Sequence, residues 1–200
     1  RQQVYDAWMA RPMAKTLQPD GSYLKGIEDE LPNSQYEREE HCQAVVTDIL
    51  EDLKIRSRGG KFHALFATSS IPQAIRYYRI FKERAPELKV TALFDPTLPN
   101  DNPDQVLYKE DGLVEILQDY NERYGLNFDL AGHAQFKKDL SLRLAHKELY
   151  RNLQPEEQID LLIVVSQMLT GFDSKWVNTL YLDKVLQYAN LIQAFSRTNR

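Results

Sequence analysis

The chain has 200 residues, a length that suits one domain of ordinary size with an appendage. Its 42% apolar and 10% aromatic content is enough to build a sizeable hydrophobic core. A formal net charge of −4 excludes a protein that binds nucleic acid through a globally basic surface, so any such contact has to be local.

Cysteine usage and hydropathy bear on the compartment. Cys42 has no second cysteine with which to form an internal disulfide or a cysteine-based metal cluster, which is typical of a reducing cytoplasm. No apolar run approaches membrane-spanning length and no signal-like start is visible. We therefore expect a cytoplasmic protein with no membrane partner and no metal ligands. Because the chain begins with Arg1, we also expect it to be a piece of something larger.

The first segment of the chain differs from the rest. Residues 1–34 contain several prolines without sustained periodicity, which predicts an extension or a connector between domains. Ser-Gln-Tyr-Glu at 34–37 is a capping-box pattern that opens a helix, and the next apolar residues have helical spacing at 42, 45, 46, 49, 50 and 53. We therefore predict a domain over 35–200.

Strands and helices alternate through this domain. Short apolar runs predict four strands, at 62–68, 89–95, 160–166 and 178–184. Ser70 with Gln73 forms a second capping box, and Pro72 fits the first turn of the helix that follows. Its predicted buried face consists of Ile71, Ala74, Ile75, Tyr78 and Phe81.

Two more helices complete the pattern. One lies around 113–120 and is closed by Gly125, after a loop predicted at 98–104. The other covers 132–151, where a row of basic residues indicates a solvated face: Arg143, Lys147 and Arg151. Alternating elements predict an α/β fold with a doubly wound, mostly parallel sheet flanked by helices.

Ligands of an open parallel sheet bind beyond the carboxyl ends of its strands. The segment that follows 160–166 is the richest in suitable groups, because Thr170 offers a hydroxyl, Gly171 allows close backbone approach and Asp173 adds a carboxylate. These groups suit phosphate and sugar oxygens. The alternative is a strand-to-strand turn in which the aspartate bonds its own backbone amides.

The last ten residues read LIQAFSRTNR. At helical spacing, Gln193, Arg197 and Arg200 share one face, and the apolar residues lie largely on the other. Taken alone, this polar face is typical of an ordinary amphipathic helix. Its meaning depends on the neighbouring segments.

Together these segments resemble a known family. A buried strand, Thr-Gly-Phe-Asp, a further strand and a helix with the Gln/Arg/Arg triplet resemble motifs V and VI of superfamily 2 helicases and translocases. The strings LLIVVSQMLTGFD, NTLYLDK and LIQAFSRTNR resemble more narrowly the restriction (R) subunit of type I restriction-modification enzymes, and FHALFATSS and QDYNERYG are also similar. The resemblance implies that 35–200 is a RecA-like helicase domain 2 of the P-loop NTPase type.

The resemblance also implies roles for individual residues. Arg197 and Arg200 would be arginine fingers that reach an ATP bound, with Mg²⁺, mainly by a first RecA-like domain of the same chain. The residues implied near the nucleotide are Gln193, Gly171 and Asp173, and those implied to contact the DNA backbone are Thr170, Ser69, Ser70 and Ser166.

The resemblance implies a setting for the whole protein. Its partners would be double-stranded DNA and the modification and specificity subunits of a restriction complex. The full-length subunit would act as an ATP-dependent type I site-specific deoxyribonuclease and DNA translocase. This fragment alone would be inactive, because no G-x-x-x-x-G-K-[ST] phosphate loop occurs in it and Gly59-Gly60-Lys61 lacks the earlier glycine.

Several features leave alternatives open. Ser174-Lys175 stands where the family pattern has Ala-Pro. Pro19-Asp20 with Asp52 and Lys54 has the letters of a nuclease site, but at long spacing. Another superfamily 2 helicase or remodeller, or a non-catalytic Rossmann-like binding module, would share much of the pattern, and sequence upstream of Arg1 would separate these alternatives.

Overall fold

The computed structural model describes residues 10–12, 15–27, 38–95, 103–165 and 174–183. The chain divides into two compact units, residues 1–42 and residues 43–200. The first unit holds an antiparallel hairpin of β1 (Thr16–Leu17) and β2 (Tyr23–Leu24). Gly21 turns this hairpin with a φ of 83°, a backbone conformation that favours glycine. That residues 1–34 form a connector between domains remains a prediction.

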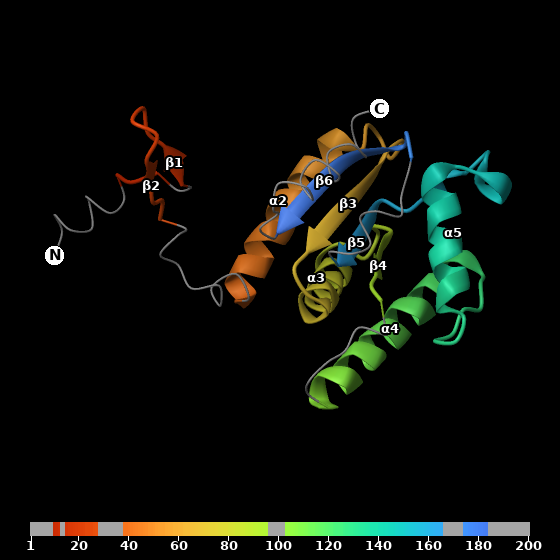
Figure 1. Ribbon diagram of the computed structural model, residues 1–200. Helices are drawn as coiled ribbons and strands as arrows, with labels where there is room; N and C mark the ends of the chain where they lie inside the picture. Colours follow the sequence, from red (N-terminus) through yellow and green to blue (C-terminus); the bar gives the residue numbers. More distant parts are fainter. Residues whose placement is uncertain (1–9, 13–14, 28–37, 96–102, 166–173, 184–200) are drawn as a thin grey trace. The chain divides into compact units, whose positions relative to one another are not determined.

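The second unit is built on a four-stranded sheet with the order β4-β5-β3-β6 (Figure 1). Its strands are β3 (His63–Thr68), β4 (Val90–Leu93), β5 (Leu161–Val165) and β6 (Val177–Asp183). Each pair of neighbouring strands in this sheet is parallel. Helices flank the sheet, so the predicted α/β fold with a parallel sheet is confirmed, and the arrangement is consistent with a RecA-like domain.

The strands follow the apolar runs closely because burial on both faces selects continuous apolar sequence. β3, β4 and β5 are buried along their whole length. In β3, Phe66 meets Tyr77 edge-on with the ring centroids 4.7 Å apart, and Phe81 lies at 6.5 Å. These contacts join the centre of the sheet to the helix that follows β3.

One helix precedes β3, a second connects β3 to β4, and a third follows β4. α2 (Glu39–Arg56) has the predicted helical stripe, with Val46, Ile49 and Leu53 buried, and the capping-box residues 34–37 lie outside the described residues. α3 (Ile71–Arg84) packs against β3, β4 and β5, and every residue of its predicted apolar face is buried. α4 (Pro103–Tyr124) packs against α3 and β4. It begins inside the segment 98–104 that was predicted as a loop, so the predicted loop ends too late in the sequence.

The helix predicted over 132–151 is shorter in the structure. α5 (His133–Ala145) ends because His146 adopts a left-handed conformation with a φ of 51°, and two short 3₁₀ turns follow, η3 (Glu148–Tyr150) and η4 (Pro155–Glu157). The predicted solvated row on this helix is also wrong at its first member, because Arg143 is only 3% exposed. Helical spacing could not reveal this, since aromatic residues from other elements bury the side chain.

Candidate functional site

The carboxyl ends of the parallel strands gather at one edge of the sheet, which is the site expected for this architecture. Thr68, the last residue of β3, pairs in register with Asp183, the last residue of β6. Ser69 and Ser70 follow Thr68, and Ser69 is exposed. Of the predicted site residues, the structure describes these two serines alone. The others lie outside the described residues: Ser166, Thr170, Gly171, Asp173, Gln193, Arg197 and Arg200.

Ser70 begins α3 at this edge. Its Oγ accepts a hydrogen bond from the backbone N–H of Gln73 at 3.3 Å, as the capping-box pattern predicts, and Pro72 occupies the first turn. The second half of the box differs. The Oε1 of Gln73 accepts from the backbone N–H of Ser69 at 3.0 Å and from the Ser69 hydroxyl at 2.6 Å. Gln73 therefore holds the residue before the cap.

The other end of the Gln73 amide reaches β6. Its Nε2 donates to Oδ2 of Asp183 at 2.7 Å, and the Tyr77 hydroxyl donates to the same oxygen. Both donors are well buried, with Gln73 5% and Tyr77 0% exposed. We call this set the edge network: Ser69, Gln73, Tyr77 and Asp183. Sequence reasoning missed it because Gln73 and Asp183 lie 110 residues apart.

A histidine completes the described part of this edge. His133, the first residue of α5, lies beside Phe94 and Asp95, which follow β4. Burial lowers the pKa of His133, while the hydrogen bond to the Phe94 backbone opposes the shift. Its buried Nε2 has no hydrogen-bond partner within the described part of the chain. The start of α5 therefore belongs to the same edge as the ends of β3, β4 and β6.

The described edge offers mainly neutral polar groups. The Ser69 hydroxyl and the first turn of α3 suit contacts with phosphate oxygens, which are commonly made by hydroxyl and amide groups as well as by cations. Within the described residues, no group of three or more His, Cys, Asp and Glu side chains is placed to hold a metal ion. Among all the residues that the structure describes, no helix has the length and apolar character needed to cross a bilayer.

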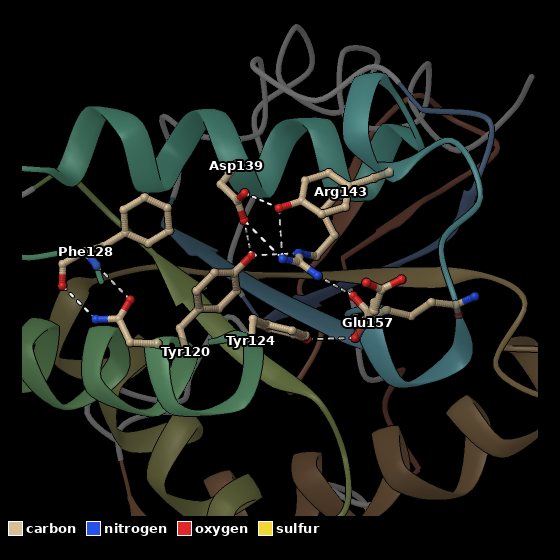
Figure 2. Close-up of polar contacts among 9 residues, drawn as sticks. Tyr120, Tyr124, Phe128, Asp139, Arg143 and Glu157 are labelled. Atoms are coloured by element: carbon tan, nitrogen blue, oxygen red, sulfur yellow. Dashed lines mark hydrogen bonds and ion pairs between the residues drawn. The ribbon is translucent and has the colours of Figure 1, made fainter. Parts of the chain in front are cut away.

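A second polar cluster centres on Arg143 (Figure 2). It lies beside Glu157, which precedes β5, and therefore toward the amino end of that strand. The guanidinium donates to the Glu157 carbonyl at 2.7 Å and to the Tyr120 hydroxyl at 3.0 Å. Its carbon lies 3.9 Å from the ring centroid of Tyr124, which is a cation–π contact. Burial raises the pKa of Tyr120 and Tyr124, so both hydroxyls keep their protons.

This Arg143 cluster joins the end of α4 to α5 and to the turn that precedes β5. Tyr124 donates to the carbonyl of Gln158, and Tyr120 donates to Asp139 of α5 at 2.6 Å. The stretch 118–125 that resembles the R-subunit family therefore contributes to packing at this point. The cluster stabilises the fold and lies away from the carboxyl edge.

Comparisons with known proteins agree with these observations. A family model described as type I restriction enzyme subunit R domain 3 matches residues 60–200. A type I restriction enzyme endonuclease subunit of Staphylococcus aureus is 33% identical over 187 residues, which cover 90% of this chain and 19% of that protein. A corresponding subunit of Staphylococcus saprophyticus is 34% identical over 169 residues, or 81% of this chain and 18% of that protein.

A shorter match has higher identity. A Haemophilus influenzae type I restriction enzyme endonuclease subunit is 46% identical over 46 residues, which are 23% of this chain and 4% of that protein. The chain spans about a fifth of the length of the staphylococcal relatives. Of the interpretations that the sequence left open, these relatives support the restriction-subunit one. The family model covers well over half of the chain, and the chain therefore belongs to the family of type I restriction enzyme R subunits.

Proposed function

We propose that this chain is the second motor domain of a type I restriction endonuclease subunit, in which ATP hydrolysis drives movement along double-stranded DNA. The observation that carries the proposal is the match of residues 60–200 to domain 3 of the R subunit. A parallel sheet with polar residues at its carboxyl edge supports it, because nucleotide motors of this architecture use that edge. The full-length protein would then be an ATP-dependent, cytoplasmic deoxyribonuclease.

In this proposal the segment LIQAFSRTNR serves ATP hydrolysis. Arg197 and Arg200 stabilise the charge that spreads over the transferred phosphoryl group, a role worth about 10³ to 10⁵ in rate for the arginine fingers of GTPases. Gln193, Gly171 and Asp173 hold the arginines or the nucleotide in register. ATP and Mg²⁺ are bound mainly by the first RecA-like domain of the same subunit.

The DNA contacts in this proposal come from hydroxyl groups near the carboxyl ends of two strands. Ser69 and Ser70 follow β3, and Ser166 and Thr170 follow β5 in the sequence. Neutral contacts of this kind position the duplex backbone without reading its sequence. Sequence recognition therefore belongs to a specificity subunit, which acts with a modification subunit in the complete complex.

The proposal is tested by replacing Arg197 or Arg200 with alanine in the full-length subunit that carries this sequence. ATP turnover at saturating duplex DNA should fall by orders of magnitude, while the affinities for ATP and DNA stay within a few fold, because the lost interaction acts in the transition state. Arg→Lys should not restore turnover, since an ammonium lacks the fork that spans two phosphoryl oxygens.

The matched control for these variants is Arg151→Ala, because Arg151 is an exposed arginine that follows η3. It should leave turnover unchanged. Near-normal ATPase in both the Arg197→Ala and the Arg200→Ala subunits, with only a lower melting temperature, would assign these side chains to a surface ion network and refute the proposed motor role.

A further inference from the structure

The chemistry of the edge network fixes the orientation of the Gln73 amide. A carboxylate can only accept hydrogen bonds, so the group that faces Asp183 at 2.7 Å is the amide nitrogen. The carbonyl end of the same amide therefore faces Ser69. It accepts both the backbone N–H and the hydroxyl of that residue, at 3.0 and 2.6 Å. One buried amide thus links the end of β3 to the end of β6.

The Ser69 hydroxyl has a single proton to donate. In the structure that proton is directed to Gln73, although the Ser69 residue itself is exposed. A DNA phosphate oxygen is also a pure acceptor, so a hydrogen bond from this hydroxyl to phosphate has to take the proton away from Gln73. The Ser69 hydroxyl can therefore donate to a phosphate oxygen or to Gln73 Oε1, but not to both at once.

When Gln73 loses the Ser69 hydroxyl as a hydrogen-bond partner, its own hydrogen bond to Asp183 weakens. After phosphate binds, Gln73 Oε1 keeps only the backbone N–H of Ser69, so the amide is less firmly oriented toward the carboxylate. Asp183 is the last residue of β6 and pairs with Thr68, which directly precedes Ser69. The sequence that continues from Asp183 leads into the proposed arginine-finger helix.

We propose that Gln73 is a positioning residue that couples phosphate contact at Ser69 to the carboxylate of Asp183, and through it to the segment that follows β6. This inference rests on the proposed function, because it assumes that Ser69 meets the DNA backbone. It deepens that function by naming the route through which DNA binding reaches the segment that carries Arg197 and Arg200. The coupling is reciprocal, so events at Asp183 alter the phosphate contact equally.

Hydrogen exchange provides a direct test of the relay. Amide exchange in the peptide that contains Val177–Asp183 is measured in the full-length subunit, assembled in its complex, with and without duplex DNA. DNA should accelerate exchange at the end of β6 by about fivefold or more, the usual scale of coupling between sites. Ser69→Ala, which lacks the hydroxyl in both states, should abolish this difference. An unchanged exchange rate with DNA in the parent subunit would overturn the relay.

Turnover measurements separate coupling from simple stability. Gln73→Leu and Ser69→Ala should each lower the stimulation of ATP turnover by DNA about fivefold. The double variant should lower it no further, because both changes break the same relay. Gln73→Leu should raise DNA affinity, because the Ser69 hydroxyl no longer has to leave Gln73 to reach phosphate.

Tyr78→Phe is the matched control, because Tyr78 also lies in α3 and donates to an aspartate, Asp119, at 2.9 Å. It should keep full stimulation. Equal losses in Gln73→Leu and Tyr78→Phe, or additive losses in the double variant, would refute the relay. The proposed function fails separately, if the Arg197 and Arg200 variants retain ATPase, and the exchange experiment still decides the relay in that case. If Gln73→Leu does not fold, the exposed Ser69→Ala variant alone supplies both measurements.

Discussion

The imidazole rings of His63 and His146 share one hydrogen bond, with their Nε2 atoms 2.8 Å apart. His63 Nδ1 lies 2.5 Å from the carbonyl oxygen of Ile159, which can only accept, so Nδ1 carries the proton of the neutral ring. The Nε2 of His63 therefore accepts, and His146 donates. His146 in turn stacks on Trp176, with the ring centroids 4.3 Å apart. A second proton on His63 would face the N–H of His146, so it requires His146 to move its own proton to Nδ1.

This pair predicts a loss of stability in mild acid. Burial lowers the pKa of His63 from 6.5 to about 4, so between these values the unfolded chain binds a proton that the folded chain does not. The free energy of unfolding should fall by about 2 kcal/mol between pH 7 and pH 5. Burial, and then Lys175, lower the pKa of His146 and add to the loss with the same sign.

Urea denaturation at the two pH values measures this loss. His63→Asn keeps a donor toward Ile159 and has no titrating ring, so its unfolding free energy should change much less between them. The interpretation is wrong if the parent and His63→Asn chains lose equal stability.

Arg143 gives a second prediction, on the stability of the fold. Its guanidinium makes hydrogen bonds to Glu157, Tyr120 and Tyr150, and no ammonium can make all three in this geometry. Arg143→Lys should lower the free energy of unfolding by about 2–4 kcal/mol. The matched control is Lys147→Ala, an exposed member of the same predicted basic row, which should cost less than ~0.5 kcal/mol. Equal effects of the two changes in urea denaturation would contradict the buried role.

A third prediction concerns Gly112, where α4 approaches α3. A Cβ at this position would come within 2.5 Å of Ile75 Cδ1 and 2.8 Å of its Cγ1, and Ile75 is fully buried. Gly→Ala inside a helix normally stabilises by about 1 kcal/mol, but here the overlap should reverse the sign and destabilise by about 1–3 kcal/mol. Thermal or urea unfolding of Gly112→Ala measures this change.

The double variant Gly112→Ala/Ile75→Ala tests the cause. Removing the Ile75 side chain makes room for the new methyl group, so the double variant should be more stable than the sum of the single losses predicts, by about 1 kcal/mol or more. Strict additivity of the two changes would show that the clash does not decide the cost.

The elements that sequence predicted well have local causes. α3 could be predicted because Ser70, Pro72 and its apolar stripe are all close in the chain. Buried strands could be predicted because each is a continuous apolar run in the sequence. The end of α5 was missed because it rests on His146 in a left-handed conformation, where the sequence has neither glycine nor asparagine. The burial of Arg143 was missed because Tyr120 and Tyr124 come from another helix.

The candidate site divides in the same way. The sequence predicted that the site lies at the carboxyl edge and named Ser69 and Ser70. Both predictions depend on features that can be read along the chain, namely the alternation of strands with helices and the hydroxyl residues that follow a strand. It did not predict that the Ser69 hydroxyl already has an acceptor in Gln73, nor that Gln73 bonds Asp183, since those contacts depend on how β6 pairs beside β3. The DNA contacts of both serines remain predictions.

The last prediction concerns this 200-residue chain when it is purified alone. It should hydrolyse no ATP with saturating duplex DNA and Mg²⁺, because in the proposed function it supplies arginine fingers and its sequence contains no phosphate loop. It should bind duplex DNA weakly and without sequence preference. Phosphate release and fluorescence anisotropy measure these two properties. ATP turnover that scales with pure protein and disappears in Arg197→Ala, but not in Arg151→Ala, would show a complete site within the chain and refute the half-site interpretation.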